Sequence, residues 1–198
     1  KELVNQPETT RWQTLEAITT EAERSWLKVL PNGIIAHDGL LNPGANVRQR
    51  GQRRNVRNEE AYRLTFNTHQ KSIQSLRLDA LTDKSLPQRG PGLNADGSFQ
   101  LAEIIVTARP LDSQDPTAVQ ALKLKPVFAA FEDDKQPIAN TVDGNPGTAW
   151  VVRTTAKKDN AAVFELETPL AGFPNGTELA VELKFVDMGI GRLRISAS

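Results

Sequence analysis

Hydrophobic and polar residues alternate with a period of two over several short stretches of the chain. Side chains of a β-strand point alternately to its two faces, so this pattern predicts strands with one buried face and one solvent-facing face. The clearest alternation runs over residues 179–185, whose apolar positions are Leu179, Val181, Leu183 and Phe185. The other stretches are 62–66, 76–80, 99–107, 122–125, 162–166 and 193–195.

Clusters of glycine, proline and asparagine separate these stretches, for example at residues 88–92, 94–97 and 173–176. Many short strands joined by such turns predict an all-β fold, an antiparallel β-sandwich or jelly roll. The 198 residues, 38% of them apolar, suffice for one core. We therefore expect a polar lead-in at residues 1–10 and a single sandwich domain over 11–198.

Residues 12–30 fit two secondary structures. Thr20, Glu21, Ala22 and Glu23 form a capping-box pattern, and apolar residues spaced from Leu15 to Leu30 lie on one helical face, so local rules favour a helix. Tertiary pairing can override such local preferences, which leaves strands as the alternative. An Asn-Gly turn at 32–33 and a short strand at 34–36 follow, and then a long polar segment from 38 to 60.

Glu103 interrupts the alternation of its own strand. Phe99, Leu101 and Ile105 share one face at odd positions, and Glu103 falls among them. A carboxylate on an apolar face costs several kcal/mol unless it is paired or coordinated. Glu103 therefore needs a cation, supplied either by an arginine such as Arg77 or Arg192 or by a metal ion.

Residues 143–150 read as an ion-binding turn that ends in a buried aromatic side chain. Oxygen-bearing side chains alternate with two glycines and a proline, and the run closes on Trp150 at the start of an apolar segment. Calcium takes six to eight oxygen ligands, and glycines let the backbone aim its carbonyls inward. The alternative is an ordinary Asn-Pro-Gly turn between two strands.

Charge and composition exclude several classes of function. Lysine plus arginine and aspartate plus glutamate each number 24, so no global field attracts nucleic acid or an anionic membrane. The chain has no cysteine, and His37 and His69 have no second ligand at metal-binding spacing, which argues against zinc and haem.

No apolar run is long enough to span a membrane. The chain begins at Lys1 without Met, which suggests a processed protein or a segment of a longer one.

No pattern of catalytic residues is present. The chain has neither a Gly-x-Ser-x-Gly elbow nor a Walker-type loop, and the acidic run at 132–134 is typical of a solvated hairpin tip. We therefore do not expect an enzyme.

The polar segment from 38 to 60 contains five arginines and no aromatic residue. Without aromatic rings it offers no platform for stacking nucleic-acid bases. Arg53 and Arg54 are candidates for contact with an anionic partner such as a sulfated or uronic polysaccharide. The alternative is a solvated loop tip balanced by Glu59 and Glu60.

Residues 128–150 resemble the opening of discoidin-type, galactose-binding-like domains. An Ala-Ala-Phe run and a polar hairpin precede Asn-Thr-Val-Asp-Gly-Asn-Pro-Gly-Thr-Ala-Trp, where those domains have a calcium-binding Asp-Gly-Asp/Asn-x-x-Thr-x-Trp turn. Residues 75–79 and 99–104 resemble their closing strands, in which a Leu-Ser-Glu-Ile strand delivers a glutamate to that calcium. Here the closing half comes first. The resemblance therefore implies a circularly permuted relative, with calcium ligands at Glu103, Asn140, Asp143, Asn145 and Thr148.

A second resemblance covers most of the chain. Residues 81–92, 96–103, 143–150 and 189–196 are similar, in that order, to a β-sandwich region in large secreted proteins of the planctomycete cytochrome type. Residues 12–15 and 32–35 match more loosely, and this placement favours strands over a helix near Thr20. The arginine that follows Gly-Pro-Gly in that family is Leu93 here. The haem-binding and other flanking domains of that family are outside this chain, so no redox function is implied.

These resemblances imply a non-catalytic carbohydrate-binding module with a structural calcium ion, located outside the cell, at its surface or in the periplasm. Its partners would be a polysaccharide and the neighbouring domains of a longer chain. Sugar modules stack aromatic rings on sugar faces, and Trp12 and Trp26 are the candidates here, because Trp150 is expected in the core. The alternative is a structural or docking module of a larger assembly that binds no glycan.

Overall fold

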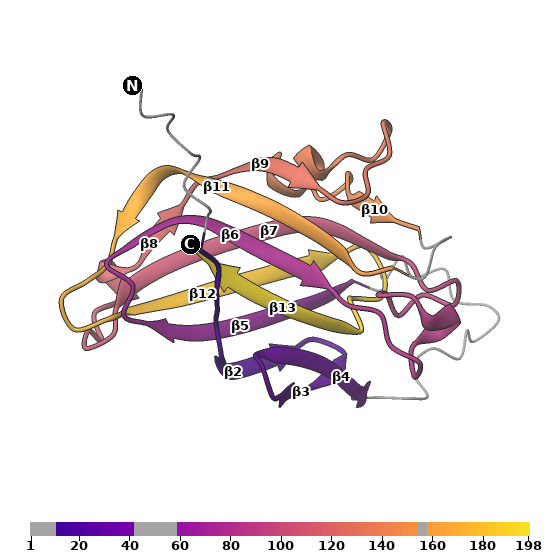
Figure 1. Ribbon diagram of the computed structural model, residues 1–198, viewed down its shortest axis with the longest axis horizontal. Helices are drawn as coiled ribbons and strands as arrows, with labels where there is room; N and C mark the ends of the chain where they lie inside the picture. Colours follow the sequence, from indigo (N-terminus) through magenta and orange to yellow (C-terminus); the bar gives the residue numbers. More distant parts are fainter. Residues whose placement is uncertain (1–10, 42–58, 154–157) are drawn as a thin grey trace, which may run out of the picture.

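The computed structural model describes residues 11–41, 59–153 and 158–198, and within them it is all-β. Two antiparallel sheets pack against each other (Figure 1), which confirms the predicted β-sandwich. Three short 3₁₀ segments, and no α-helix, occur in these ranges: η1 (Pro87–Arg89), η2 (Pro116–Ala118) and η3 (Ile138–Val142). The polar lead-in predicted at residues 1–10 lies outside the described residues.

Sheet A has the strand order β3, β4, β13, β6, β11, β9, and β1 also pairs with β13. Its strands are β1 (Gln13–Thr14), β3 (Ser25–Leu30), β4 (Ile34–Leu40), β6 (Ser72–Ala80), β9 (Leu124–Ala129), β11 (Asn160–Ala171) and β13 (Arg192–Ala197). Sheet B has the order β10, β7, β12, β5, β2, and β8 also pairs with β7. Its strands are β2 (Ala17–Ala22), β5 (Glu60–Thr68), β7 (Phe99–Pro110), β8 (Gln120–Leu122), β10 (Trp150–Val152) and β12 (Thr177–Phe185).

The core lies between the two sheets and is built from the apolar positions of the alternating strands. Phe164 of β11 and Leu183 of β12 are fully buried. Tyr62 meets Phe185 edge-on, with ring centroids 5.0 Å apart, and its hydroxyl donates to the carbonyl oxygen of Ile190 at 3.1 Å. The period-two pattern therefore located the buried faces of β5, β11 and β12 correctly.

The helix that local rules favoured over residues 20–30 is wrong. This region forms β2, which pairs with β5, and β3, which pairs with β4. In the sheet, Glu23 forms an ion pair with Arg63, and Ser25 is buried against Glu60. A helix cap contributes only about 1 kcal/mol, whereas pairing with β5 and β4 satisfies the backbone of the whole segment.

The strand predicted at residues 122–125 is divided between the two sheets. β8 ends at Leu122 in sheet B, and β9 begins at Leu124 in sheet A, so the chain crosses from one sheet to the other at Lys123. Periodicity registers the alternation of side chains but not a change of sheet.

The predicted position of Glu103 on the apolar face is also wrong. β7 carries a bulge, because Lys184 of β12 faces Glu103 while Phe185 faces Leu101, and Ala102 is the extra residue. The bulge reverses the alternation, so Ile104 is buried while Ile105 is exposed. Glu103 therefore lies on the outer face of sheet B.

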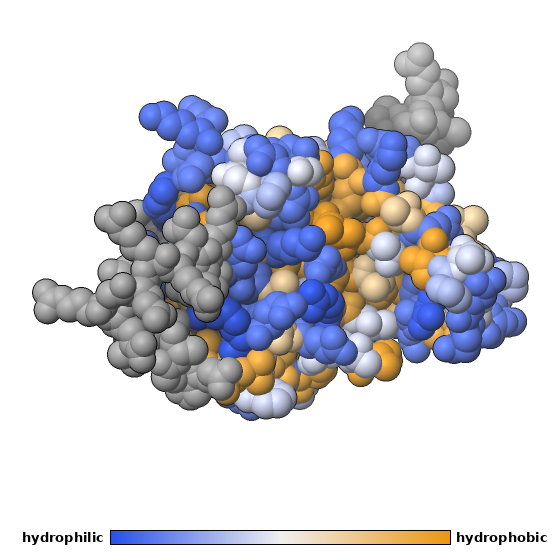
Figure 2. All heavy atoms as spheres, turned by 180° about the vertical axis from the view of Figure 1, so that it is seen from behind, coloured by the Kyte–Doolittle hydropathy of each residue, from blue (hydrophilic) through white to orange (hydrophobic). Residues whose placement is uncertain are grey.

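Apolar residues also remain on the surface, and Figure 2 shows a band of them between polar regions on one side of the molecule. The large exposed apolar side chains among the described residues are Ile18, Trp26, Val29, Ile105, Val119, Val127, Phe128 and Phe131. In the same residues there is no helix of the length and hydrophobicity needed to cross a membrane.

Replacing Phe164 with Ala is expected to lower the free energy of unfolding by about 3–5 kcal/mol, because it leaves a cavity between the sheets. Glu165→Ala, at the neighbouring exposed position, is expected to stay within about 0.5 kcal/mol of wild type. Denaturant titration of both variants measures the difference. Equal destabilisation by the two substitutions would contradict the assignment of inner and outer faces.

Candidate functional site

The turn predicted to bind calcium is closed by its own aspartate. η3 ends at Val142, and the carboxylate of the next residue, Asp143, accepts from the main-chain N–H of Asn145 and from the Thr148 hydroxyl, both at 2.8 Å. Gly144 has a φ of 72°, a left-handed conformation that glycine adopts without strain. Each carboxylate oxygen has two lone pairs, so Asp143 keeps acceptor capacity beyond these two bonds.

The two asparagines of the predicted ligand set stabilise the turn through their side chains. The Asn145 side-chain oxygen accepts from the N–H of Gly147 at 3.0 Å, and the Asn140 side-chain amide donates to the carbonyl of Ala149 at 3.0 Å. These bonds fix the path of the main chain from η3 to β10. They also direct the side chains of Asn140 and Asn145 toward the backbone of the turn.

Trp150 anchors the end of the turn in the core. It is fully buried, its indole N–H donates to the carbonyl of Phe131 at 3.0 Å, and its ring meets Phe99 edge-on at 5.4 Å. β10 pairs with β7 so that Trp150 lies opposite Leu101. The turn that precedes Trp150 therefore lies on the side of this pair where β7 continues toward Glu103. The prediction that Trp150 belongs to the core is confirmed.

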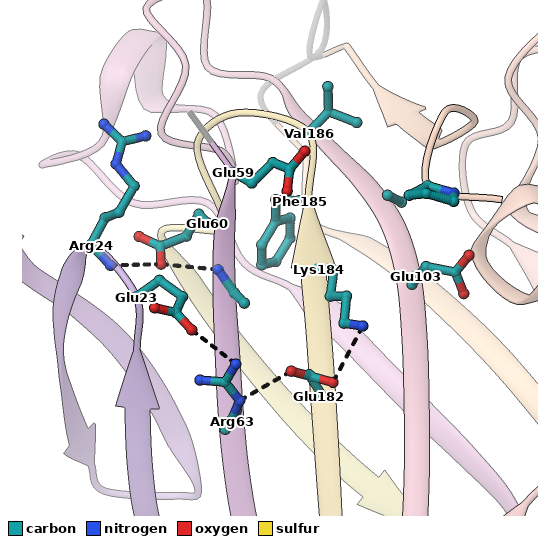
Figure 3. Close-up of a pocket in the computed structure, with 13 residues that line it drawn as sticks. Glu23, Arg24, Glu59, Glu60, Arg63, Glu103, Glu182, Lys184, Phe185 and Val186 are labelled. Carbon is teal, nitrogen blue, oxygen red and sulfur yellow. Dashed lines mark hydrogen bonds and ion pairs between the residues drawn. The ribbon is translucent and has the colours of Figure 1, made fainter. Parts of the chain in front are cut away.

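Glu103 approaches this turn with one carboxylate oxygen that lacks a hydrogen-bond partner. Its Oε1 atom is buried and has no hydrogen bond. Lys184 lies directly across from it in the β7–β12 pair, but the ammonium of Lys184 is 3.6 Å from Glu182 instead. In Figure 3 the Glu103 carboxylate points away from Lys184 and toward the turn. The arginines proposed as partners are engaged elsewhere, Arg77 with Asp79 and Arg192 with Asp83.

The electrostatics of Glu103 reflect this placement. Burial raises the pKa of the Glu103 carboxyl, and the negative charge of Asp143 raises this pKa further, while Lys184 lowers it in part. The turn and β7 therefore bring two carboxylates close enough to repel each other. His37 Nε2 and Gln70 Oε1 are the other buried, unpartnered side-chain atoms in the described residues, and Glu103 is the one that carries a carboxylate charge.

The donor set fits calcium better than a transition metal. The described residues contain no group of three His, Cys, Asp or Glu side chains that could hold a metal. Calcium accepts main-chain carbonyl, hydroxyl and water oxygens in place of further carboxylates. Glu103, Asp143, the Thr148 hydroxyl and the carbonyls of the turn are oxygen donors of that kind.

A cavity of about 490 Å³ adjoins the turn on the outer face of sheet B. Glu103 and Pro146 form its border with the turn, and Ala61 lines it together with the almost fully buried Ala102 and Phe185. Its volume falls in the range of small-molecule sites, about 300–1,000 Å³.

Four charged side chains cross one wall of the cavity in alternating sign: Glu23, Arg63, Glu182 and Lys184 (Figure 3). We call this set the charged row. Arg63 lies 2.8 Å from Glu23 and 3.0 Å from Glu182, and Lys184 lies 3.6 Å from Glu182.

A buried carboxylate supports the cavity from below. Glu60, only 1% exposed, accepts from the Ser25 hydroxyl at 2.6 Å and from the main-chain N–H groups of Arg24 and Ala61, both at 3.1 Å. These bonds tie the turn between β2 and β3 to the start of β5. Sequence reasoning missed this role, because the partners of Glu60 are 35 and 36 residues distant along the chain.

The two tryptophans predicted to bind a ligand do not line the cavity. Trp26 is 62% exposed, but it lies on β3, an edge strand of sheet A, and Trp12 is half-buried beside β1. Arg53 and Arg54 lie outside the described residues. The charged row was visible in the sequence as the polar positions of two alternating strands, but only the pairing of β5 with β12 brings Arg63 and Glu182 together.

Comparison of the chain with protein-family models, with curated proteins and with solved structures gives no match.

In a calcium-free buffer, the stability that Glu103 contributes is expected to fall as the pH rises. Its pKa is higher in the folded than in the unfolded chain, so the folded state binds more protons between the two pKa values and is favoured below them. Glu103→Gln removes this titration. Unfolding free energies of both proteins, measured across the acidic range in the presence of a chelator, are expected to diverge with rising pH, wild type becoming the less stable. Parallel pH profiles would contradict this assignment.

Proposed function

We propose that this protein is a calcium-stabilised, non-catalytic carbohydrate-binding module, secreted as part of a larger extracellular protein. The observation that carries the proposal is the buried, unpartnered oxygen of Glu103, on a carboxylate that points toward the turn and not toward Lys184. A cation between the carboxylates of Glu103 and Asp143 would coordinate that oxygen. It would also attract both carboxylates and so offset their mutual repulsion.

Calcium would act here as a clamp between two segments distant in sequence. Glu103 belongs to β7, and Asp143 follows η3, so an ion held by both joins the strand to the turn. Thr148 and the main-chain carbonyls of the turn would complete the oxygen shell. A binding site formed only on folding stabilises the folded state in proportion to the ligand concentration.

The carbohydrate part of the proposal rests on the resemblance to galactose-binding-like domains and on the cavity beside the turn. A fold of this class hosts many functions, so the cavity and not the sandwich is the argument for a ligand. The competing function is a docking module that binds no glycan. The exposed Trp26 and Phe128, on the two edge strands of sheet A, favour contacts of that kind.

Calcium at about 10 mM is expected to raise the melting temperature of the wild-type protein by about 3–10 °C, and a chelator to reverse the rise. This range assumes the affinity of extracellular calcium modules, with dissociation constants of about 10⁻⁴–10⁻³ M. Differential scanning calorimetry with calcium, with magnesium and with a chelator measures the effect.

Glu103→Gln is the decisive variant for this measurement. It is expected to abolish the calcium-induced rise while keeping or increasing the melting temperature without calcium, since it removes an uncompensated charge. Glu165→Gln, on the exposed face of β11, is the matched control and should keep the full rise. A calcium response that survives Glu103→Gln would place the ion elsewhere.

Retention on immobilised polysaccharides separates the two functions. The carbohydrate-binding module predicts retention on at least one glycan, and its loss when a chelator is added. Stabilisation by calcium without retention on any glycan would instead support the docking module.

A further inference from the structure

We propose that the cavity beside the turn is the glycan-binding site, and that the charged row Glu23, Arg63, Glu182 and Lys184 recognises an uncharged sugar of one or two rings. This inference rests on the proposed function and specifies where and what the module binds. It does not use Trp12, Trp26 or the arginine-rich segment, which sequence reasoning singled out.

The charged row offers hydrogen bonds in an order that suits neighbouring hydroxyl groups. Carboxylates only accept and guanidinium and ammonium groups only donate, so acceptors and donors alternate along the wall. A sugar hydroxyl both donates and accepts, and adjacent hydroxyls can bind adjacent members of such a row. Bonds of this kind, with one charged partner, are shorter and stronger than neutral ones.

The row remains accessible despite its internal ion pairs. The side chains of Arg63 and Glu23 are 50% exposed, that of Lys184 is 45% exposed, and that of Glu182 is 25% exposed. Ion pairs between half-exposed side chains contribute little to stability and are readily exchanged for other partners. A ligand can therefore take up their remaining donors and acceptors at small cost to the fold.

The charges that line the cavity disfavour an anionic ligand. Two carboxylates and two cations cancel along the charged row, and the whole lining has five carboxylates, Glu23, Glu59, Glu60, Glu103 and Glu182, against three cations, Arg24, Arg63 and Lys184. An anionic sugar would meet Glu23, Glu182 and the nearby Glu103, and the repulsion would oppose binding. Pro146, which is exposed, supplies a small apolar surface for the C–H groups of a sugar ring.

Glu103 links this site to the proposed calcium ion. It borders the cavity and lies opposite Lys184. A calcium ion held by Glu103 and the turn would neutralise the Glu103 charge at the edge of the cavity and fix the position of Pro146. Calcium and glycan should therefore increase each other's affinity by the same factor.

The test compares two double variants on the same sheet face. Arg63→Gln with Glu182→Gln alters the charged row, while Arg109→Gln with Glu178→Gln removes an ion pair at the opposite end of the sheet, where Arg109 and Glu178 are 2.7 Å apart. The probes are immobilised galactan, mannan, xylan and β-glucan, with polygalacturonate and dextran sulfate as anionic comparators, each with calcium present. Calorimetry with calcium alone reports on folding and on the ion site of every variant.

The expected result is retention of wild type on a neutral glycan, at least about tenfold weaker binding by the charged-row variant, and binding within about twofold of wild type by the control. The charged-row variant should also keep the calcium-induced rise in melting temperature, whereas Glu103→Gln should lose both responses.

Two results would overturn the inference while leaving the proposed function intact. These are unchanged glycan binding by the charged-row variant, and wild-type retention only on the anionic comparators. Absence of wild-type retention on every probe would overturn the inference together with the carbohydrate part of the proposed function. The calcium response would then be judged separately by the calorimetry.

Discussion

The pairing of β10 with β7 is the constraint on which the site depends. It sets Trp150 opposite Leu101, with the indole buried against Phe99, and so holds the preceding turn above Glu103. The turn is otherwise stabilised only by local hydrogen bonds from Asp143, Asn145 and Asn140. Without the buried tryptophan, those bonds and the buried Ile138 and Thr141 of η3 would remain, but the strand pairing that carries the end of the turn to Leu101 would be lost.

Glu103 contrasts with the other carboxylates on the outer faces of the sheets. Asp79 is held by Arg77 and Arg194, and Glu178 by Arg109, each with short, well-oriented bonds. Glu103 has a lysine across the strand pair and turns from it toward a second carboxylate. A partly buried carboxylate that lies near a second carboxylate and has an oxygen without a partner is more typical of a ligand site than of a surface ion pair. The cavity that begins at the same residue supports this interpretation.

The sequence predicted those parts of the fold that depend on local alternation. Periodicity identified β5, β6, β7, β11, β12 and β13, and the apolar segment after the turn placed Trp150 in the core, because each of these features depends on neighbouring residues. It failed at residues 20–30, where pairing with distant strands overrides a helix signal. It also failed at Glu103, where the bulge at Ala102 shifts the alternation by one residue.

The site was predicted only in part, for the same reason. Residues 143–150 signalled an oxygen-rich turn, and the resemblance to a permuted galactose-binding-like domain predicted that Glu103 would meet it. The charged row and the support from Glu60 arise from strand pairing between residues that are tens of positions apart. No local pattern marks such residues as neighbours. Sequence patterns therefore favoured Trp12, Trp26, Arg53 and Arg54 as ligand-binding residues.

The most direct test of the account is a crystal structure of the protein grown with calcium, with anomalous scattering used to locate the ion. The account predicts one calcium ion within about 2.3–2.6 Å of a Glu103 carboxylate oxygen and of oxygens from the turn that begins at Asp143. Finding Glu103 paired with Lys184, and no ion between β7 and the turn, would contradict it.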